Sequence, residues 1–225
     1  MSLRVAAIIP AFNEAATIAR VVAGVAPAVR RVIVVDDGSA DATAERARAA
    51  GAEVIVHPSN KGKGHAVRAG LERVFAGDFT HVLLLDGDMQ HLPEEAPTLL
   101  AEAERTGAEI VLGERRFDRH RMPSARYHAN RIGSRVLSWF VGVPVRDTQC
   151  GFRVFRVDAL RRVPLSARGY EIETEMLVKV TRRGGRVASV PVTAVYEGQV
   201  SNLRPLPDTT RTCFLAVYYR FLEPL

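Results

Sequence analysis

The stretch RVIVVDDGSADATAERARAAGAEVIVH, residues 31–57, places two apolar runs on either side of a segment with helical spacing. The runs RVIVVDD (31–37) and AEVIVH (52–57) are rich in β-branched residues, which predicts strands buried on both faces of a sheet. The segment 40–50 between them contains Asp41, a residue type that caps helix starts. Strand, helix and strand in this order predict a parallel βαβ unit.

The same alternation extends in both directions along the chain. Further apolar runs predict strands at 4–10, 81–87, 108–113, 152–157 and 186–195. Segments with helical spacing predict helices at 14–26, 63–76, 93–106, near 128–141, 171–183 and 208–222, with a loop at 197–207. We therefore predict an α/β fold with a mainly parallel central sheet flanked by helices, in a Rossmann-like arrangement.

The composition narrows the class of protein. The chain has 225 residues with 31 Lys and Arg against 25 Asp and Glu, so its formal charge of +6 favours an anionic partner. Its two cysteines have no CxxC spacing and no nearby His cluster, so the sequence suggests neither a disulfide framework nor a zinc site, and a reducing cytosol fits best. No apolar window approaches the roughly 18 residues of a membrane span. We expect a soluble or peripheral protein with one domain, because no repeat or linker interrupts the chain.

Polar residues follow three of the predicted strands, as PAFNE (10–14), DDGSAD (36–41) and DGDMQH (86–91). In open α/β sheets, ligands bind beyond the carboxyl ends of the strands. In an extended segment, Asp86 and Asp88 would project to one side, with Gly87 between them allowing close approach of a ligand. Together with the amide oxygen of Gln90, they suit Mg²⁺ or Mn²⁺ completed by substrate phosphate oxygens. A tight turn before the next helix is the alternative.

A glycine- and lysine-containing segment, NKGKGHAVRAG (60–70), precedes a predicted helix. It has neither the residue order of a P-loop nor that of a dinucleotide-binding turn. Lys61 and Lys63 either contact an anionic ligand or lie solvated on a loop.

Six blocks occur in the order and spacing of a known family: IIPAFNE, VVDDGSADAT, NKGKGHAVRAGL, LLLDGDMQH, VLGERR and RDTQCGFRVFR. The chain resembles family-2 glycosyltransferases and, more narrowly, the dolichyl- or polyprenyl-phosphate mannosyl- and glucosyltransferase branch. The resemblance implies the A-type glycosyltransferase fold, a nucleotide-diphospho-sugar donor (a GDP- or UDP-hexose), a divalent metal and inversion at the anomeric carbon. It divides the single domain, 1–225, into a nucleotide-sugar-binding half (1–113) and an acceptor-binding half (114–225).

The resemblance also implies roles for individual residues. Those expected to bind the donor nucleotide are Pro10, Phe12, Glu14, Val35, Asp37, Lys63 and Gly87. The metal is expected at Asp86, Asp88 and Gln90, and the candidate catalytic residues are Asp86, Asp88, Arg115 and Asp147. The acceptor phosphate is expected at Arg115, Arg131 and Arg204. Guanidinium groups suit this task because they bind phosphate in a bidentate manner.

The nature of the acceptor decides whether a protein base is needed. A lipid phosphate is already anionic at neutral pH, whereas a sugar hydroxyl needs a carboxylate within hydrogen-bond reach. The candidate bases are Asp147, Glu171, Glu173 and Glu175. Alternatively, Asp147 is a loop carboxylate that orders the preceding arginines, and the three glutamates lie on an exposed helix face.

Two positions depart from the family pattern. In EGQVSNLRPL, Asn202 stands where the family often has lysine, so that Arg204 is the nearest cation. Glu171 replaces a lysine that is found in some relatives.

Seven arginines at 115–135 suit an acceptor phosphate and an acidic membrane surface, or else a solvated loop. No nucleic-acid recognition module is present. We expect an enzyme that transfers a hexose to polyprenyl phosphate. Its expected location is the cytoplasm, with peripheral binding to the cytoplasmic face of the membrane. The alternatives are the same donor chemistry with a soluble hydroxyl acceptor, and a non-catalytic nucleotide-sugar-binding protein. A phosphatase with Asp86 as nucleophile is disfavoured, because Gln90 stands where such enzymes usually have a hydroxyl residue.

Overall fold

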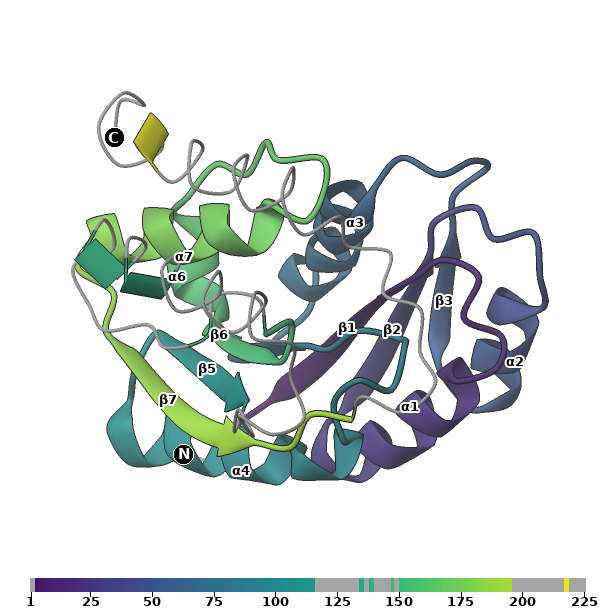
Figure 1. Ribbon diagram of the computed structural model, residues 1–225, viewed down its shortest axis with the longest axis horizontal. Helices are drawn as coiled ribbons and strands as arrows, with labels where there is room; N and C mark the ends of the chain where they lie inside the picture. The colour runs from purple at the N-terminus through teal and green to yellow at the C-terminus, as the bar shows by residue number, and fades with distance from the viewer. Residues whose placement is uncertain are drawn as a thin grey trace.

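The computed structural model describes residues 3–115, 134–135, 138–139, 147, 150–195 and 217–218. Figure 1 shows a twisted sheet with helices packed on both sides. The strands are β1 (Val5–Ala11), β2 (Arg31–Asp36), β3 (Glu53–Val56), β4 (His81–Leu84), β5 (Ile110–Arg115), β6 (Arg153–Arg156) and β7 (Val187–Val192). The helices are α1 (Ile18–Val25), α2 (Thr43–Ala49), α3 (Lys63–Phe75), α4 (Ala96–Thr106), α6 (Val157–Arg161) and α7 (Ile172–Arg182), with 3₁₀ turns η1 (Ala26–Ala28) and η2 (Pro93–Glu95).

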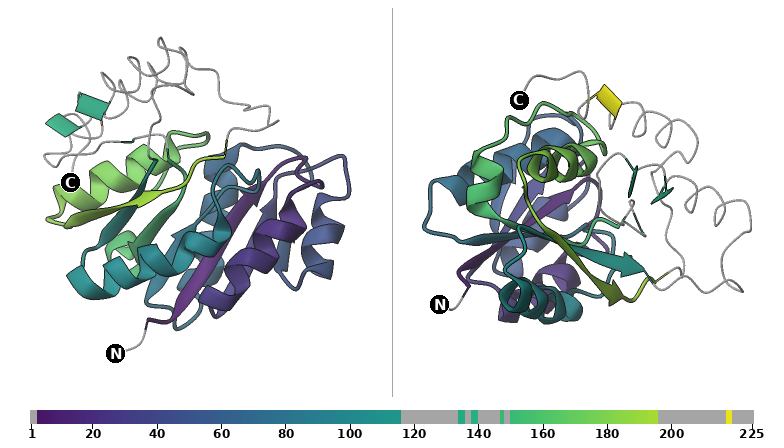
Figure 2. Two further views of the ribbon diagram at one scale, coloured as in Figure 1. Left: turned by 60° about the horizontal axis from the view of Figure 1, so that its bottom comes forward. Right: turned by 90° about the vertical axis from the view of Figure 1, so that its left-hand side faces the viewer.

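The sheet is buried on both faces, which explains why its strands are continuously apolar. Along β1, Ala6 and Ile8 pack in one core with α3, α6 and α7, while Ala7 and Ile9 pack in the other with α1, α2 and α4. Successive strand side chains point to opposite faces, so both sets must be apolar. Figure 2 shows the two helical layers with the sheet between them.

The strand order is β3-β2-β1-β4-β6-β5-β7. The first three strands extend the sheet to one side of β1, and β4 begins its extension to the other side. β1 pairs in parallel with β2 on one side and with β4 on the other. The carboxyl ends of β1 and β4 therefore lie side by side at a topological switch point, where open α/β sheets bind their ligands. Glu14 follows the first of these ends and Asp86 follows the second.

The predicted α/β fold is confirmed, with differences in detail. β6 runs antiparallel to both neighbours, β4 and β5, so the sheet is mixed although its first four strands are parallel. The short helix α6, directly after β6, was not predicted. β4 ends at Leu84, three residues before the predicted strand end, and this changes the geometry of the site.

Several predictions lie outside the described residues. They include the loop at 197–207, most of the helices expected near 128–141 and at 208–222, and the residues Arg131, Arg204 and Asn202. In the part of the chain that is described, no helix has the length and apolarity needed to cross a membrane.

Candidate active site

The segment after β4 forms a turn that presents Asp86 and Asp88. The prediction that these residues lie in an extended segment is wrong, because Gly87 and Asp88 form a turn and Met89 has a positive φ of 60°. The backbone N–H of Gln90 donates to Asp88 Oδ1 at 3.0 Å, and the Thr17 hydroxyl donates to the Gly87 carbonyl at 2.6 Å. These bonds, and not a strand pleat, fix the turn and the Asp88 carboxylate.

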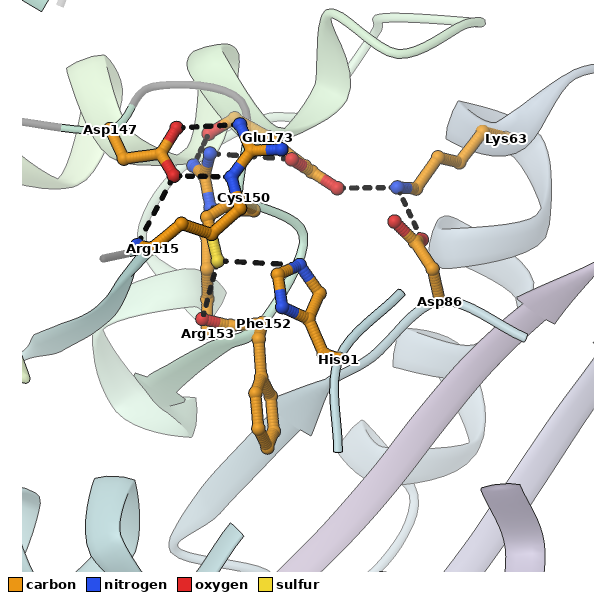
Figure 3. A network of polar contacts seen from close by, with 9 residues as sticks. All are labelled: Lys63, Asp86, His91, Arg115, Asp147, Cys150, Phe152, Arg153 and Glu173. Carbon is orange, nitrogen blue, oxygen red and sulfur yellow. Dashed lines mark hydrogen bonds and ion pairs between the residues drawn. The ribbon is translucent and has the colours of Figure 1, made fainter. Parts of the chain in front are cut away.

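Lys63, the first residue of α3, reaches Asp86 from across the site. Its Nζ lies 2.5 Å from Asp86 Oδ1 and 2.5 Å from Glu173 Oε1 on α7, as Figure 3 shows. Burial opposes the charge on Lys63, but the two carboxylates outweigh this effect and raise its pKa. Burial likewise opposes the charge on Asp86, yet Lys63 lowers the pKa of that carboxyl below its usual value. The interpretation of Lys63 as a solvated loop lysine is wrong.

Gly151 leaves room for the Asp86 carboxylate. A Cβ atom built on Gly151 would clash with Asp86 Oδ2, so this glycine lets the chain before β6 pack directly on the acidic group. The block QCGFRVF contains Gly151, but its closeness to Asp86 depends on a tertiary contact that the sequence does not reveal.

Asp88 and Glu14 form no ion pair with a lysine or arginine among the residues that the structure describes. Burial and the nearby Asp86 raise the pKa of Asp88 to about 6. Burial also raises the pKa of Glu14, and Asp88 and Asp86 add to that effect. A cation placed beside either carboxyl would therefore stabilise its charged form.

The donor set fits a hard divalent cation that is completed by a substrate. Among the described residues, no three His, Cys, Asp or Glu side chains form a metal site by themselves. Clustered carboxylates that include one without an ion-pair partner, here Asp88, are typical of sites where Mg²⁺ keeps water and takes phosphate oxygens from a substrate. Asp86 and Asp88 would hold such a cation. The role of Gln90 as a third ligand stays a prediction.

The raised pKa of Asp88 predicts how stability depends on pH. Without a metal, the folded state binds a proton at Asp88 up to about pH 6, whereas the unfolded chain releases it near pH 4. Stability is therefore lost as pH rises through this window. We expect Asp88→Asn to raise the melting temperature by roughly 2–4 °C at pH 8, about 1 kcal/mol, with no gain at pH 4. Thermal unfolding in chelator measures the difference.

The exposed Asp78 provides the control, because its side chain is 78% accessible and its ion pair with Arg4, at 3.2 Å, is solvated. Asp78→Asn is expected to leave the melting temperature unchanged at both pH values. We assign the loss of stability at high pH to the charged Asp88 carboxylate. An equal gain in melting temperature for Asp88→Asn at pH 4 and pH 8 would contradict this assignment.

A second ion pair joins Arg115, at the end of β5, to Asp147 (Figure 3). Arg115 Nε lies 2.5 Å from Asp147 Oδ2, and its second guanidinium nitrogen donates to Oδ1 at 2.9 Å. The Asp147 side chain is fully buried. This geometry matches the alternative in which Asp147 orders an arginine, and a catalytic role for either residue stays a prediction.

Beneath this pair lies a buried cysteine. Cys150 Sγ is 3.5 Å from His91 Nε2, and burial raises the pKa of the thiol far above its usual range. Such a thiol is chemically inert at neutral pH. Cys150 therefore serves to pack the interior of the site.

The three glutamates near the start of α7 are buried, so the prediction of an exposed helix face is wrong. Glu175 accepts hydrogen bonds from the backbone of Ser166 and Ala167, and Lys179 lies 2.8 Å away. Glu173 pairs with Lys63 and with Arg153, whose guanidinium is 3.3 Å from it. Sequence reasoning considered Glu173 as a base, and missed its role in holding Lys63.

Asp37 organises the loop that leads to Lys63. Its buried carboxylate accepts hydrogen bonds from the backbone N–H of Lys61 at 3.1 Å and of Gly62 at 2.7 Å. His57 Nδ1 lies 2.7 Å from the same carboxylate. Contact between Asp37 and a nucleoside stays a prediction.

The remaining predicted donor residues differ in exposure. Phe12 is 37% exposed just after β1, and Pro10 is half-buried. The side chain of Val35 is fully buried in the core, so only its backbone can face a ligand. Gly87 is buried in the turn.

Comparison with known proteins adds independent findings. The family described as Glycosyl transferase family 2 matches residues 6–164. The chain is 35% identical to glycosyltransferase AglJ of Haloferax volcanii over 94% of this chain and 70% of that protein. It is 34% identical to undecaprenyl-phosphate mannosyltransferase of Micrococcus luteus over 86% of this chain and 84% of that protein.

A solved structure shares the fold. It is glucosyl-3-phosphoglycerate synthase of Mycobacterium tuberculosis in complex with Mn²⁺, UDP-glucose and glycerol 3-phosphate. The TM-score is 0.74 at 26% identity, and the alignment covers 99% of this chain and 82% of that chain.

Proposed function

The chain belongs to glycosyl transferase family 2 and is a glycosyltransferase that uses a nucleotide sugar, and from this premise we propose that its acceptor is a polyprenyl phosphate. In this proposal a hexose moves from a GDP- or UDP-hexose with inversion, and the reaction depends on Mg²⁺ or Mn²⁺. The relative named undecaprenyl-phosphate mannosyltransferase supports the lipid acceptor, and the Mn²⁺ and UDP-glucose complex supports the donor and the metal.

One observation carries the choice of acceptor. Three of the four carboxylates that could deprotonate a hydroxyl are held by buried or nearly buried cations: Asp147 by Arg115, Glu173 by Lys63, and Glu175 by Lys179. To take a proton from a hydroxyl, each of these carboxylates would have to give up contact with its cation. A phosphate acceptor needs no base. The site therefore favours an acceptor that arrives already ionised.

The proposed reaction is a single displacement. An acceptor phosphate oxygen attacks the anomeric carbon while the bond from that carbon to the diphosphate breaks on the opposite face, and the nucleoside diphosphate leaves. When bound at Asp86 and Asp88, a divalent cation supplies Lewis-acid stabilisation of the departing charge. Lys63 contacts the same carboxylate and adds a positive charge on the donor side.

An acceptor panel tests this proposal. The protein is incubated with Mn²⁺ and a labelled GDP- or UDP-hexose, together with polyprenyl phosphate, unphosphorylated polyprenol or glycerol 3-phosphate. We expect label in the organic phase with polyprenyl phosphate alone, as a product labile to mild acid. Transfer to polyprenol at an equal rate would show that the acceptor phosphate is not required, and would contradict the proposal.

A second candidate acceptor is a soluble phosphorylated molecule. It is favoured by the likeness to the synthase that was solved with glycerol 3-phosphate. This version needs a base for the attacking hydroxyl, so it predicts that Asp147→Asn or Glu171→Gln abolishes transfer while donor binding survives. Label that stays in the aqueous phase with glycerol 3-phosphate, and none in lipid, would establish it in place of the lipid acceptor.

A further inference from the structure

The ammonium group of Lys63 lies where a cation would neutralise the acidic turn. It contacts Asp86 and Glu173 at 2.5 Å each, and its side chain is only 11% exposed. Among the described residues, no other Lys or Arg forms an ion pair with Asp86 or Asp88. Lys63 is thus the protein's own counter-ion for this turn.

Lys63 and a divalent cation have overlapping requirements. Both need the Asp86 carboxylate, and two cations on one carboxylate repel each other strongly in a partly buried site. The inference rests on the proposed metal site at Asp86 and Asp88. We propose that Lys63 is a displaceable counter-ion, which neutralises Asp86 in the metal-free protein and withdraws from it when a divalent cation binds.

The structure provides a second position for the withdrawn ammonium group. Glu173 contacts Lys63 through Oε1, and Arg153 contacts the other oxygen, Oε2, of the same carboxylate (Figure 3). The Tyr170 ring centroid is 5.5 Å from Nζ, within range of a cation–π contact. Lys63 therefore keeps a carboxylate and an aromatic face after it leaves Asp86, and its charge stays beside the donor site.

Direct binding of Mn²⁺ alone, measured by the electron paramagnetic resonance signal of the free ion, tests the inference without donor or acceptor. Because Lys63→Met removes the competitor, we expect it to tighten Mn²⁺ binding by about tenfold, the scale of coupling between contacting charges. The control is Lys61→Met, which removes the same charge from an exposed side chain two positions earlier. It is expected to change affinity by less than about twofold.

A second variant gives the opposite sign. Glu173→Gln leaves Lys63 with Asp86 as its partner, so Mn²⁺ binding is expected to weaken by severalfold. Adding Lys63→Met to Glu173→Gln is expected to restore tight binding. Equal effects of the Lys61 and Lys63 variants would overturn displacement in favour of a general field effect. Tighter binding by Glu173→Gln would also overturn displacement. Failure of every protein to bind Mn²⁺ at millimolar concentration would also overturn it.

The wild-type protein provides a measurement that does not depend on the folding of a variant. Lysine acetylation followed by peptide mass mapping is expected to modify Lys63 severalfold faster in Mg²⁺ than in chelator, with Lys61 unchanged. A Lys63 rate that is the same or slower in Mg²⁺ would count against displacement. Asp86→Asn separates the two proposals: if it binds Mn²⁺ as tightly as wild type, then the metal site at Asp86 and Asp88 in the proposed function is itself misplaced.

Discussion

Asp86→Asn is expected to lower the rate of hexose transfer by about 10³-fold, the scale of loss when a preorganised charge at a departing group is removed. Asp86 is the carboxylate that both the proposed cation and Lys63 contact. Gly151 has no Cβ atom and therefore leaves space for this carboxylate. Asparagine keeps the size of the side chain and removes its charge. The measurement is the initial rate at saturating donor and Mn²⁺, together with Mn²⁺ binding.

Asp78→Asn serves as the matched control, since it removes one aspartate charge from an exposed position at the opposite end of β4. It is expected to retain the wild-type rate. If Asp86→Asn keeps more than about a tenth of the wild-type rate, the assignment of the leaving-group site to this turn is wrong.

Arg153→Met is expected to lower the free energy of unfolding by about 3–5 kcal/mol, which corresponds to a fall of about 10 °C in melting temperature. Arg153 is 1% exposed, and its guanidinium donates to the Cys150 carbonyl at 2.7 Å and to the Glu173 carbonyl at 3.1 Å. Methionine fills a similar volume, but it leaves these carbonyls and the buried Glu173 carboxylate without this donor. Thermal and denaturant unfolding measure the loss.

The same strand offers a control for Arg153. Arg156, three positions along β6, pairs with Glu109 at 3.1 Å, but its side chain is 43% exposed. Arg156→Met is expected to cost less than about 1 kcal/mol, as is usual for a solvated ion pair. Similar losses for the two variants would show that burial of the Arg153 network contributes little.

The alternation of β-branched runs with helical spacing was enough to predict the α/β class and each described strand to within a few residues. Local periodicity carries this information, because a strand covered on both faces must be apolar along its whole length. The same reasoning placed PAFNE and DGDMQH at one edge of the sheet, since parallel strands end on the same side. It did not predict that β6 enters antiparallel between β4 and β5, a pairing that depends on contacts between distant segments.

The sequence by itself determined the sheet, the carboxylates at its edge and the family to which the chain belongs. Only the tertiary structure decided the ion pairing and the pKa values of those carboxylates. Lys63 and Glu173 are 110 positions apart, and their pairing beside Asp86 requires α3 and α7 to pack on the same face of the sheet. The shifted pKa values of Asp88 and Glu14 arise from burial and from neighbours brought together by folding, which no local pattern of residues encodes.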